Sequence, residues 1–168
     1  MPPTDPLQEQ LRDLLCLAVV GDHVRWVLRG PGAPELAAWL AQATAVWRAD
    51  ADVVALHLAG TGVPPDGRVR SLALDTPWNW VPDGWLDAEE GRQLMAERLG
   101  RLAAWANDAR LRGEPGPAHR PHLQEIADHL RHQLETLGRL ADACQSPGGG
   151  SQRRGRRPGR YSEPTIAP

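Results

Sequence analysis

The chain has 168 residues, a length typical of one domain, and its 41% hydrophobic and 24% charged residues argue against wholesale disorder. No apolar run approaches the ~20 residues of a membrane-spanning helix, and no basic-then-apolar leader begins the chain, so we expect a cytoplasmic protein with no membrane partner. The two cysteines, Cys16 and Cys144, are too few and too far apart for a disulfide framework or a zinc knuckle.

The charge is distributed unevenly along the chain. Residues 1–145 contain 14 Arg and 20 acidic residues, a net charge of −6, whereas residues 146–168 contain five Arg and only Glu163, a net charge of +4. The second stretch is rich in Gly, Pro, Ser and Arg and has almost nothing to bury, so it cannot offset the entropy lost on ordering. We therefore predict a globular body over residues 1–145 and a disordered basic tail over residues 146–168.

Apolar residues recur at helical spacing in four stretches of the body, at about residues 5–28, 34–59, 87–111 and 121–144. Gly and Pro residues separate the first two stretches and end the second. Asp87 suits the N-cap of the third helix, with Glu90 placed three residues later as in a capping box. No alternating strand pattern competes with these helices. The fold class is therefore predicted to be all-α.

The lengths of the connections predict how the helices are arranged. About five residues join the first two helices and about ten join the last two, whereas about 27 residues, 60–86, lie between the second and third. Two short turns and a long central crossover are typical of a ferritin-like four-helix bundle. The crossover contains Trp78, Trp80 and Trp85, and we expect it to pack on the bundle; a small-molecule pocket or a subunit contact is the alternative.

The other tryptophans fall on the predicted helices. Trp39, Trp47 and Trp105 lie within apolar stripes, which favours a position in the core over stacking on nucleic-acid bases. Trp26 follows the end of the first apolar stripe, and we expect it at a subunit interface.

Two short segments resemble signatures of the Dps family, the ferritin-like proteins that protect DNA during starvation. Residues 25–31, Arg-Trp-Val-Leu-Arg-Gly-Pro, are similar to the His-Trp-Asn-Val-Lys/Arg-Gly-Pro signature that ends the family's first helix. Residues 62–67, Gly-Val-Pro-Pro-Asp-Gly, are similar to the turn after its second helix, at matching spacing. The resemblance covers about residues 7–143. It implies a hollow dodecamer that oxidises Fe(II) at sites shared between subunits, usually with hydrogen peroxide, stores the ferric mineral, and in many members binds DNA through basic tails.

The resemblance also implies where an iron site would lie. The family uses two histidines, a carboxylate, an Asp and a Glu, and the matching positions here are Arg25, Ala37, Ala41, Asp52 and Leu56. Fe(II) prefers carboxylate oxygen and imidazole nitrogen, and Asp52 alone supplies such a ligand. Arg25 instead brings a permanent positive charge, so we predict that Fe(II) oxidation is weak or lost. We expect Arg25 to pair with Asp52 across a subunit interface.

Other residues allow a rebuilt metal site. Asp50 and His57 are seven residues apart on one face of the second helix, and His23 lies on the neighbouring first helix. These three side chains are an alternative metal site, although a hydrogen bond at an interface is the simpler interpretation.

The fourth helix carries a comparable polar face. Four polar residues of this helix fall within about 80° of arc at 100° per residue. Two of them, Glu125 and His129, are four residues apart and could ligate a metal. A solvated flank beside the leucine stripe is the simpler interpretation. The residues are His122, Glu125, His129 and His132.

The basic tail has its own predicted role. Guanidinium groups suit phosphate oxygens, and the tail contains no element that reads base edges, so we expect sequence-independent, salt-sensitive binding to the DNA backbone. A solubility or processing tail is the alternative. The predicted DNA-binding residues are Arg153, Arg154, Arg156, Arg157 and Arg160.

These observations favour a Dps-like shell protein that associates with DNA at the nucleoid and protects it. An active iron-oxidising and iron-storing protein with a rebuilt site is one alternative. A small helical interaction module, whose tail binds a protein partner, is another.

Overall fold

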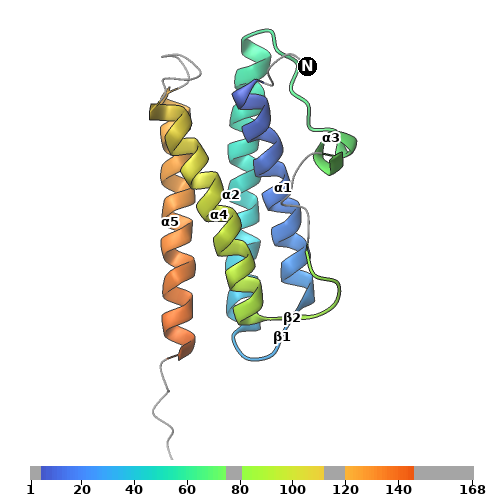
Figure 1. The fold of residues 1–168 in the computed structure, drawn as a ribbon, viewed down its shortest axis with the longest axis vertical. Coiled ribbons are helices and arrows are strands. Elements are labelled where there is room, and N and C mark those ends of the chain that lie inside the picture. The colour runs from blue at the N-terminus through green and yellow to red at the C-terminus, as the bar shows by residue number, and fades with distance from the viewer. Residues whose placement is uncertain (1–4, 75–80, 112–119, 146–168) are drawn as a thin grey trace, which may run out of the picture.

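The computed structural model describes residues 5–74, 81–111 and 120–145. Within them, four long helices run side by side: α1 (Pro6–Val27), α2 (Ala33–Gly60), α4 (Ala88–Leu111) and α5 (Arg120–Gln145) (Figure 1). A short helix, α3 (Val69–Leu74), and two short strands, β1 (Leu28–Arg29) and β2 (Leu86–Asp87), are the remaining described elements. The all-α, ferritin-like fold predicted from the sequence is confirmed, and its four long helices lie close to the predicted ranges.

The direction of the helices follows from the long crossover. Helices α1 and α2 form one antiparallel pair and α4 and α5 another, and these pairs make the most extensive contacts between helices (Figure 1). Helix α2 ends at the opposite end of the bundle from the start of α4, so the chain between them returns along the full length of the bundle. This is the crossover that the connection lengths predict.

Local sequence explains where the helices begin. The Asp5 carboxylate accepts a hydrogen bond of 2.8 Å from the backbone N–H of Leu7, with Pro6 at the first helical position. At the start of α4, the Asp87 carboxylate accepts from the Glu90 backbone N–H at 2.8 Å, and the Glu90 carboxylate accepts from the Asp87 N–H at 3.0 Å. The predicted capping box is therefore confirmed.

Strands β1 and β2 pair in parallel, with Leu28 opposite Leu86 and Arg29 opposite Asp87. Leu86 is buried, so this pairing anchors the end of the crossover against the end of α1. The sequence does not predict it, because two residues per strand are too short for an alternating pattern to appear.

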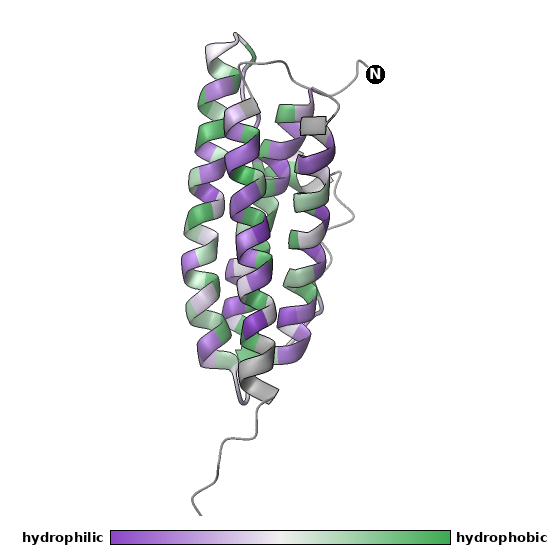
Figure 2. Ribbon diagram, turned by 90° about the vertical axis from the view of Figure 1, so that its left-hand side faces the viewer, coloured by the Kyte–Doolittle hydropathy of each residue, from purple (hydrophilic) through white to green (hydrophobic). Residues whose placement is uncertain are grey.

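The core lies between the four long helices, each of which carries both hydrophobic and hydrophilic residues (Figure 2). Trp47 is completely buried, and the half-buried Trp39 lies in a T-shaped arrangement with it at a centroid distance of 6.2 Å. Trp105 is only half-buried, at the margin of the core. None of the described helices is both long and apolar enough to cross a bilayer.

The crossover touches the bundle without using the described tryptophan. Gln8 of α1 exchanges two hydrogen bonds with the backbone of Asp66, at 2.8 and 2.9 Å, and the Cys16 thiol donates to the Leu72 carbonyl at 3.7 Å. These contacts show the crossover packed on the bundle at the described residues, as expected, but Trp85 itself is 61% exposed and the adjacent Leu86 occupies the buried position. Trp78 and Trp80 lie outside the described residues.

Candidate functional site

The positions at which the family resemblance implies iron ligands lie mainly on one outer surface of α1 and α2. Asp22 and Trp26 are four residues apart on α1, and three positions of α2, 48, 52 and 56, follow one another at the same spacing, so each set shares a helix face. An ion pair between Asp22 and Arg48 joins the two faces. We call this surface the Asp22 face; its residues are Asp22, Arg25, Trp26, Arg48, Asp52 and Leu56.

Asp22 is the centre of the charge network on this face. Its carboxylate, 14% exposed, accepts from the Arg25 guanidinium at 3.0 Å and from the Arg48 guanidinium through its other oxygen. The Thr44 hydroxyl lies 3.4 Å from the same carboxylate. Two permanent cations therefore share one carboxylate where the resemblance implies a site for Fe(II), and both guanidinium groups oppose the approach of another cation.

Of the other positions implied for iron ligands, only Asp52 has a side chain that could bind a metal ion. Ala41, Asp52 and Leu56 are exposed, Leu56 by 75%, and Ala37 is half-buried. Within the chain, Arg25 pairs with Asp22; its expected pairing with Asp52 of a second subunit stays a prediction. The donor chemistry of this face does not fit a diiron-carboxylate site, because Asp52 is exposed and Asp22 is bound to two arginines.

The two polar faces singled out in the sequence meet each other where α2 packs against α5. Asp50 and His129 approach to 3.0 Å between Oδ1 and Nδ1, and the His57 and His122 rings lie 5.9 Å apart between centroids. Further along, the Trp47 indole N–H donates to the Gln133 side-chain oxygen. Sequence reasoning recognised each polar face but not their pairing, which depends on the register between two helices distant in sequence.

Asp50 is a buried carboxylate in the contact between α2 and α5. Its side chain is 7% exposed, and Oδ2 is buried without a hydrogen-bond partner in the described part of the chain. Burial raises the pKa of Asp50, while the hydrogen bond from His129 opposes that rise. Glu125 and His132, the remaining residues of the α5 face, are exposed.

The structure pairs these residues two at a time. Over residues 5–74, 81–111 and 120–145, no group of three or more His, Cys, Asp or Glu side chains is placed to hold a metal ion. His23 is half-buried on α1, while Asp50 meets His129 and His57 meets His122. The alternative set of His23, Asp50 and His57 is therefore not assembled as one site here.

The predicted DNA-binding residues of the tail, Arg153, Arg154, Arg156, Arg157 and Arg160, lie outside the described residues.

Comparison with known proteins gives a consistent result at the level of the fold. No protein-family model matches the chain, and no curated protein matches it in sequence. Among solved structures, it is similar to Dps92 from Deinococcus radiodurans, with a TM-score of 0.76 and 19% identity over 80% of this chain and 82% of the other. The chain has the Dps fold.

Two further Dps structures support this assignment. A C-terminal deletion mutant of Mycobacterium smegmatis Dps has a TM-score of 0.75 and 19% identity, over 80% of this chain and 94% of the other. The Vibrio cholerae Dps protein has a TM-score of 0.64 and 16% identity, over 82% and 87%. It is described as a member of a superfamily of ferritin-like diiron-carboxylate proteins. The resemblance seen in residues 25–31 and 62–67 is thus confirmed for the fold.

Proposed function

We propose that this protein is a divergent Dps-like shell subunit that assembles with copies of itself and associates with DNA through its basic tail, with weak or lost Fe(II) oxidation. The observation that carries this proposal is the Asp22 face on a Dps fold. It combines exposed apolar side chains, which suit a subunit contact, with an arginine, Arg25, at one of the positions implied for iron ligands and a second, Arg48, bound to the same carboxylate.

The exposed apolar residues of the Asp22 face support self-association. Trp26 is 67% exposed and Leu56 is 75% exposed, an unfavourable state for large apolar side chains in an isolated subunit. A two-fold axis through this face would place the Asp22 faces of two subunits against each other in opposite directions. The end that carries Trp26 would then meet the partner's end that carries Leu56. The proposed contact also includes the ion pair between Arg25 and Asp52 of the partner subunit, within a dodecameric shell.

The charge network of the Asp22 face supports the loss of iron chemistry. Fe(II) is a substrate of the family's oxidation reaction. Arg25 replaces one of its implied ligands here, and a second guanidinium group, that of Arg48, binds the same Asp22 carboxylate. Fe(II) oxidation with hydrogen peroxide should not exceed that of a protein-free control. Stoichiometric oxidation that is abolished by Asp52→Ala would contradict this part of the proposal.

The composition of the tail supports binding to DNA. Five phosphate contacts per tail would give a slope of about −4.5 in a plot of log affinity against log salt concentration. One tail would bind weakly, whereas many tails on one shell would bind by avidity. Binding of this kind would be consistent with nucleoid association in the cytoplasm.

A gel shift at low salt tests the role of the tail. Full-length protein should retain duplex DNA of unrelated sequences, and a chain truncated after Gln145 should release it. A second variant keeps the tail length and replaces its five arginines with glutamine, which separates charge from length. DNA retention that is unchanged in both variants would reject the role of the tail in DNA binding.

A further inference from the structure

Asp50 and His129 join α2 to α5 in an arrangement that fits the surroundings of a metal ion. The Asp50 side chain is 7% exposed, and His129 is its one hydrogen-bond partner among the described residues, at 3.0 Å between Oδ1 and Nδ1. An ionised carboxylate can only accept a hydrogen bond, so Nδ1 of His129 carries the hydrogen and Nε2 carries a lone pair. Metal-binding histidines commonly donate their second ring N–H to a carboxylate in this way.

The exposed part of the His129 ring lies on the same helix face as a second carboxylate. The His129 side chain is 43% exposed, and its Nε2 makes no hydrogen bond within the described residues. Glu125 lies one turn earlier on α5, a spacing that places Cβ atoms ~5–6 Å apart. Glu125 is exposed and forms no hydrogen bond or ion pair across the described part of the chain. A Glu and a His in this relation can chelate one metal ion through a carboxylate oxygen and Nε2.

The local charge matches a divalent cation. Asp50 and Glu125 are both carboxylates, and the groups whose charges act on Asp50 are His129 and Glu125, with no arginine of the described residues among them. Asp50 Oδ2 is buried without a hydrogen-bond partner in the same residues, so the charge of this carboxylate is incompletely compensated. A dication on His129 Nε2 would compensate it through the ring. The Asp22 face differs, because two guanidinium groups already bind its carboxylate.

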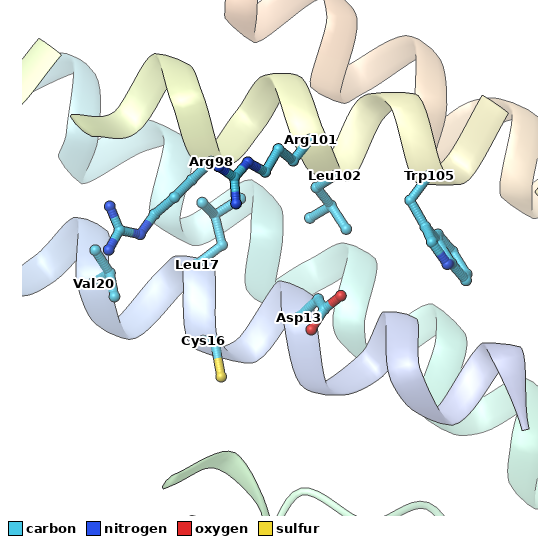
Figure 3. Close-up of a pocket in the computed structure, with 8 residues that line it drawn as sticks. All are labelled: Asp13, Cys16, Leu17, Val20, Arg98, Arg101, Leu102 and Trp105. Atoms are coloured by element: carbon cyan, nitrogen blue, oxygen red, sulfur yellow. The ribbon is translucent and has the colours of Figure 1, made fainter. Parts of the chain in front are cut away.

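A cavity between α1 and α4 is the competing place for a cation. Its volume is about 80 Å³, and it opens to solvent. Its walls include two side chains of types that bind zinc, Asp13 and Cys16 of α1. Arg98 and Arg101 of α4 line the same cavity, and their guanidinium groups oppose the entry of a cation (Figure 3). We therefore expect no metal ion in this α1–α4 cavity.

We propose that Glu125 and His129 of α5 bind a divalent transition-metal ion such as zinc, with Asp50 as the positioning residue behind the His129 ring. Water fills the remaining coordination positions, because no group of three or more His, Cys, Asp or Glu side chains is placed to hold a metal ion among the described residues. Imidazole favours zinc over magnesium, which prefers oxygen ligands. The site needs neither the basic tail nor the Asp22 face, so it can be tested apart from the proposed function.

Isothermal titration calorimetry of the full-length protein tests this proposal with Zn²⁺ as the probe and Mg²⁺ as the control. We expect saturable zinc binding with a Kd at least about tenfold lower than that for Mg²⁺, because Mg²⁺ does not favour an imidazole ligand. No saturable zinc binding, or equal affinity for the two ions, would overturn the proposal.

A second acidic residue and histidine on α5 provide matched controls. Asp128 and His132 have the same spacing as Glu125 and His129, but the His132 ring forms no hydrogen bond to a carboxylate within the described residues. Glu125→Gln and His129→Gln should each raise the Kd for zinc at least about tenfold, whereas His132→Gln should leave it unchanged. Glu125 is exposed, so its variant should fold normally. An unchanged Kd in Glu125→Gln, or equal losses in the two histidine variants, would contradict the assigned ligands.

Two further measurements test other locations for the ion. Asp13→Asn should leave the zinc affinity unchanged, and a loss of affinity would place the ion in the α1–α4 cavity. Zinc X-ray absorption should detect one imidazole ligand. Two imidazole ligands would assign the ion to His57 and His122, whose rings lie 5.9 Å apart between centroids. Either of these contrary results would overturn the proposal.

The role of Asp50 has a readout that is separate from packing. Asp50→Asn keeps an acceptor for the His129 Nδ1–H but removes the charge, and changes of such supporting residues typically weaken metal binding by ~10–100-fold. We expect the Kd for zinc to rise about tenfold, while the urea midpoint of the metal-free protein does not fall, because a buried charge is removed. Unchanged zinc affinity, or a lower midpoint alongside the loss of affinity, would reduce Asp50 to a packing residue and overturn its assigned role.

Discussion

Two carboxyl groups on the same helix, Asp22 and Asp13, have opposite surroundings. Asp22 binds two guanidinium groups within the subunit, and the large apolar side chains of the same face remain exposed. Asp13 shares a cavity with two guanidinium groups and forms no ion pair with either across the described residues. The difference teaches that the carboxylate of Asp22 is bound by arginine within the subunit, whereas no ion pair within the described residues binds the carboxyl group of Asp13.

The largest expected effect comes from the apolar side of the Asp22 face. Trp26→Glu places a charge where the proposed subunit contact must exclude water, so the assembly should dissociate to monomers or small oligomers. Trp85→Glu is the matched control, because Trp85 is 61% exposed and Trp26 is 67% exposed. Size-exclusion chromatography with light scattering measures both. Dissociation by the control alone would reverse the assignment of the contact surface.

The second effect tests how closely the two helices beneath the Asp22 face are packed. A Cβ atom at Gly21 would lie 2.7 Å from Thr44 Cγ2 and 2.8 Å from Trp47 Cζ3, both in the adjacent helix α2. Gly21→Ala should therefore lower the free energy of unfolding by about 1–3 kcal/mol through overpacking.

Gly100 provides the matched control for this substitution, because a Cβ atom there meets nothing within 4 Å. Gly100→Ala should stabilise the protein by about 0.5–1 kcal/mol through helix propensity. Denaturant unfolding measures both changes, and equal effects at the two glycines would show that α1 and α2 are not in close contact at Gly21.

The third effect separates Asp13 from Asp22 by pH. The pKa of Asp13 rises on folding from 3.8 to about 6, so the folded state holds this proton more tightly and its contribution to stability falls as pH rises through that interval. Asp13→Asn should therefore stabilise the protein at about pH 7.5 by about 1–2 kcal/mol, after allowance for solvent screening. Near pH 4 the gain should be much smaller. Urea unfolding at both pH values measures the difference, and a pH-independent gain would argue against a titrating Asp13.

The smallest effect concerns the ion pairs of Asp22. Asp22→Asn removes the carboxylate that Arg25 and Arg48 share and should lower the free energy of unfolding by about 1 kcal/mol, because both arginines are partly solvated. Asp128→Asn removes an exposed ion pair within α5 and should cost less than about 0.5 kcal/mol. Denaturant unfolding compares the two, and a larger loss for the α5 variant would contradict the central position of Asp22.

Much of the fold follows from the sequence because its signals are local. Four apolar stripes and the lengths of three connections predict the bundle and its crossover, and Asp87 with Glu90 predicts the start of α4. The parallel pairing of β1 and β2 was missed because it is set by the return of the crossover to the end of α1. The exposure of Trp85 beside the buried Leu86 could not be predicted, because composition does not specify which of the two neighbours is buried.

The candidate sites were predicted less completely because they depend on contacts between helices. Asp50 and His129 were each recognised on a polar face, but their 3.0 Å contact follows from the register of α2 against α5. Asp22 and Arg25 at a spacing of three were a local signal that sequence reasoning overlooked. The α1–α4 cavity has no sequence signature, because its charged residues come from helices separated by the whole crossover.

Analytical ultracentrifugation of the full-length protein tests the central claim most directly. If the Asp22 face is a subunit contact on a Dps fold, the chain of 18.4 kDa should sediment as a closed particle of about 220 kDa, twelve times its own mass. A monomer or dimer at micromolar concentration would contradict the shell and leave a small helical interaction module in its place.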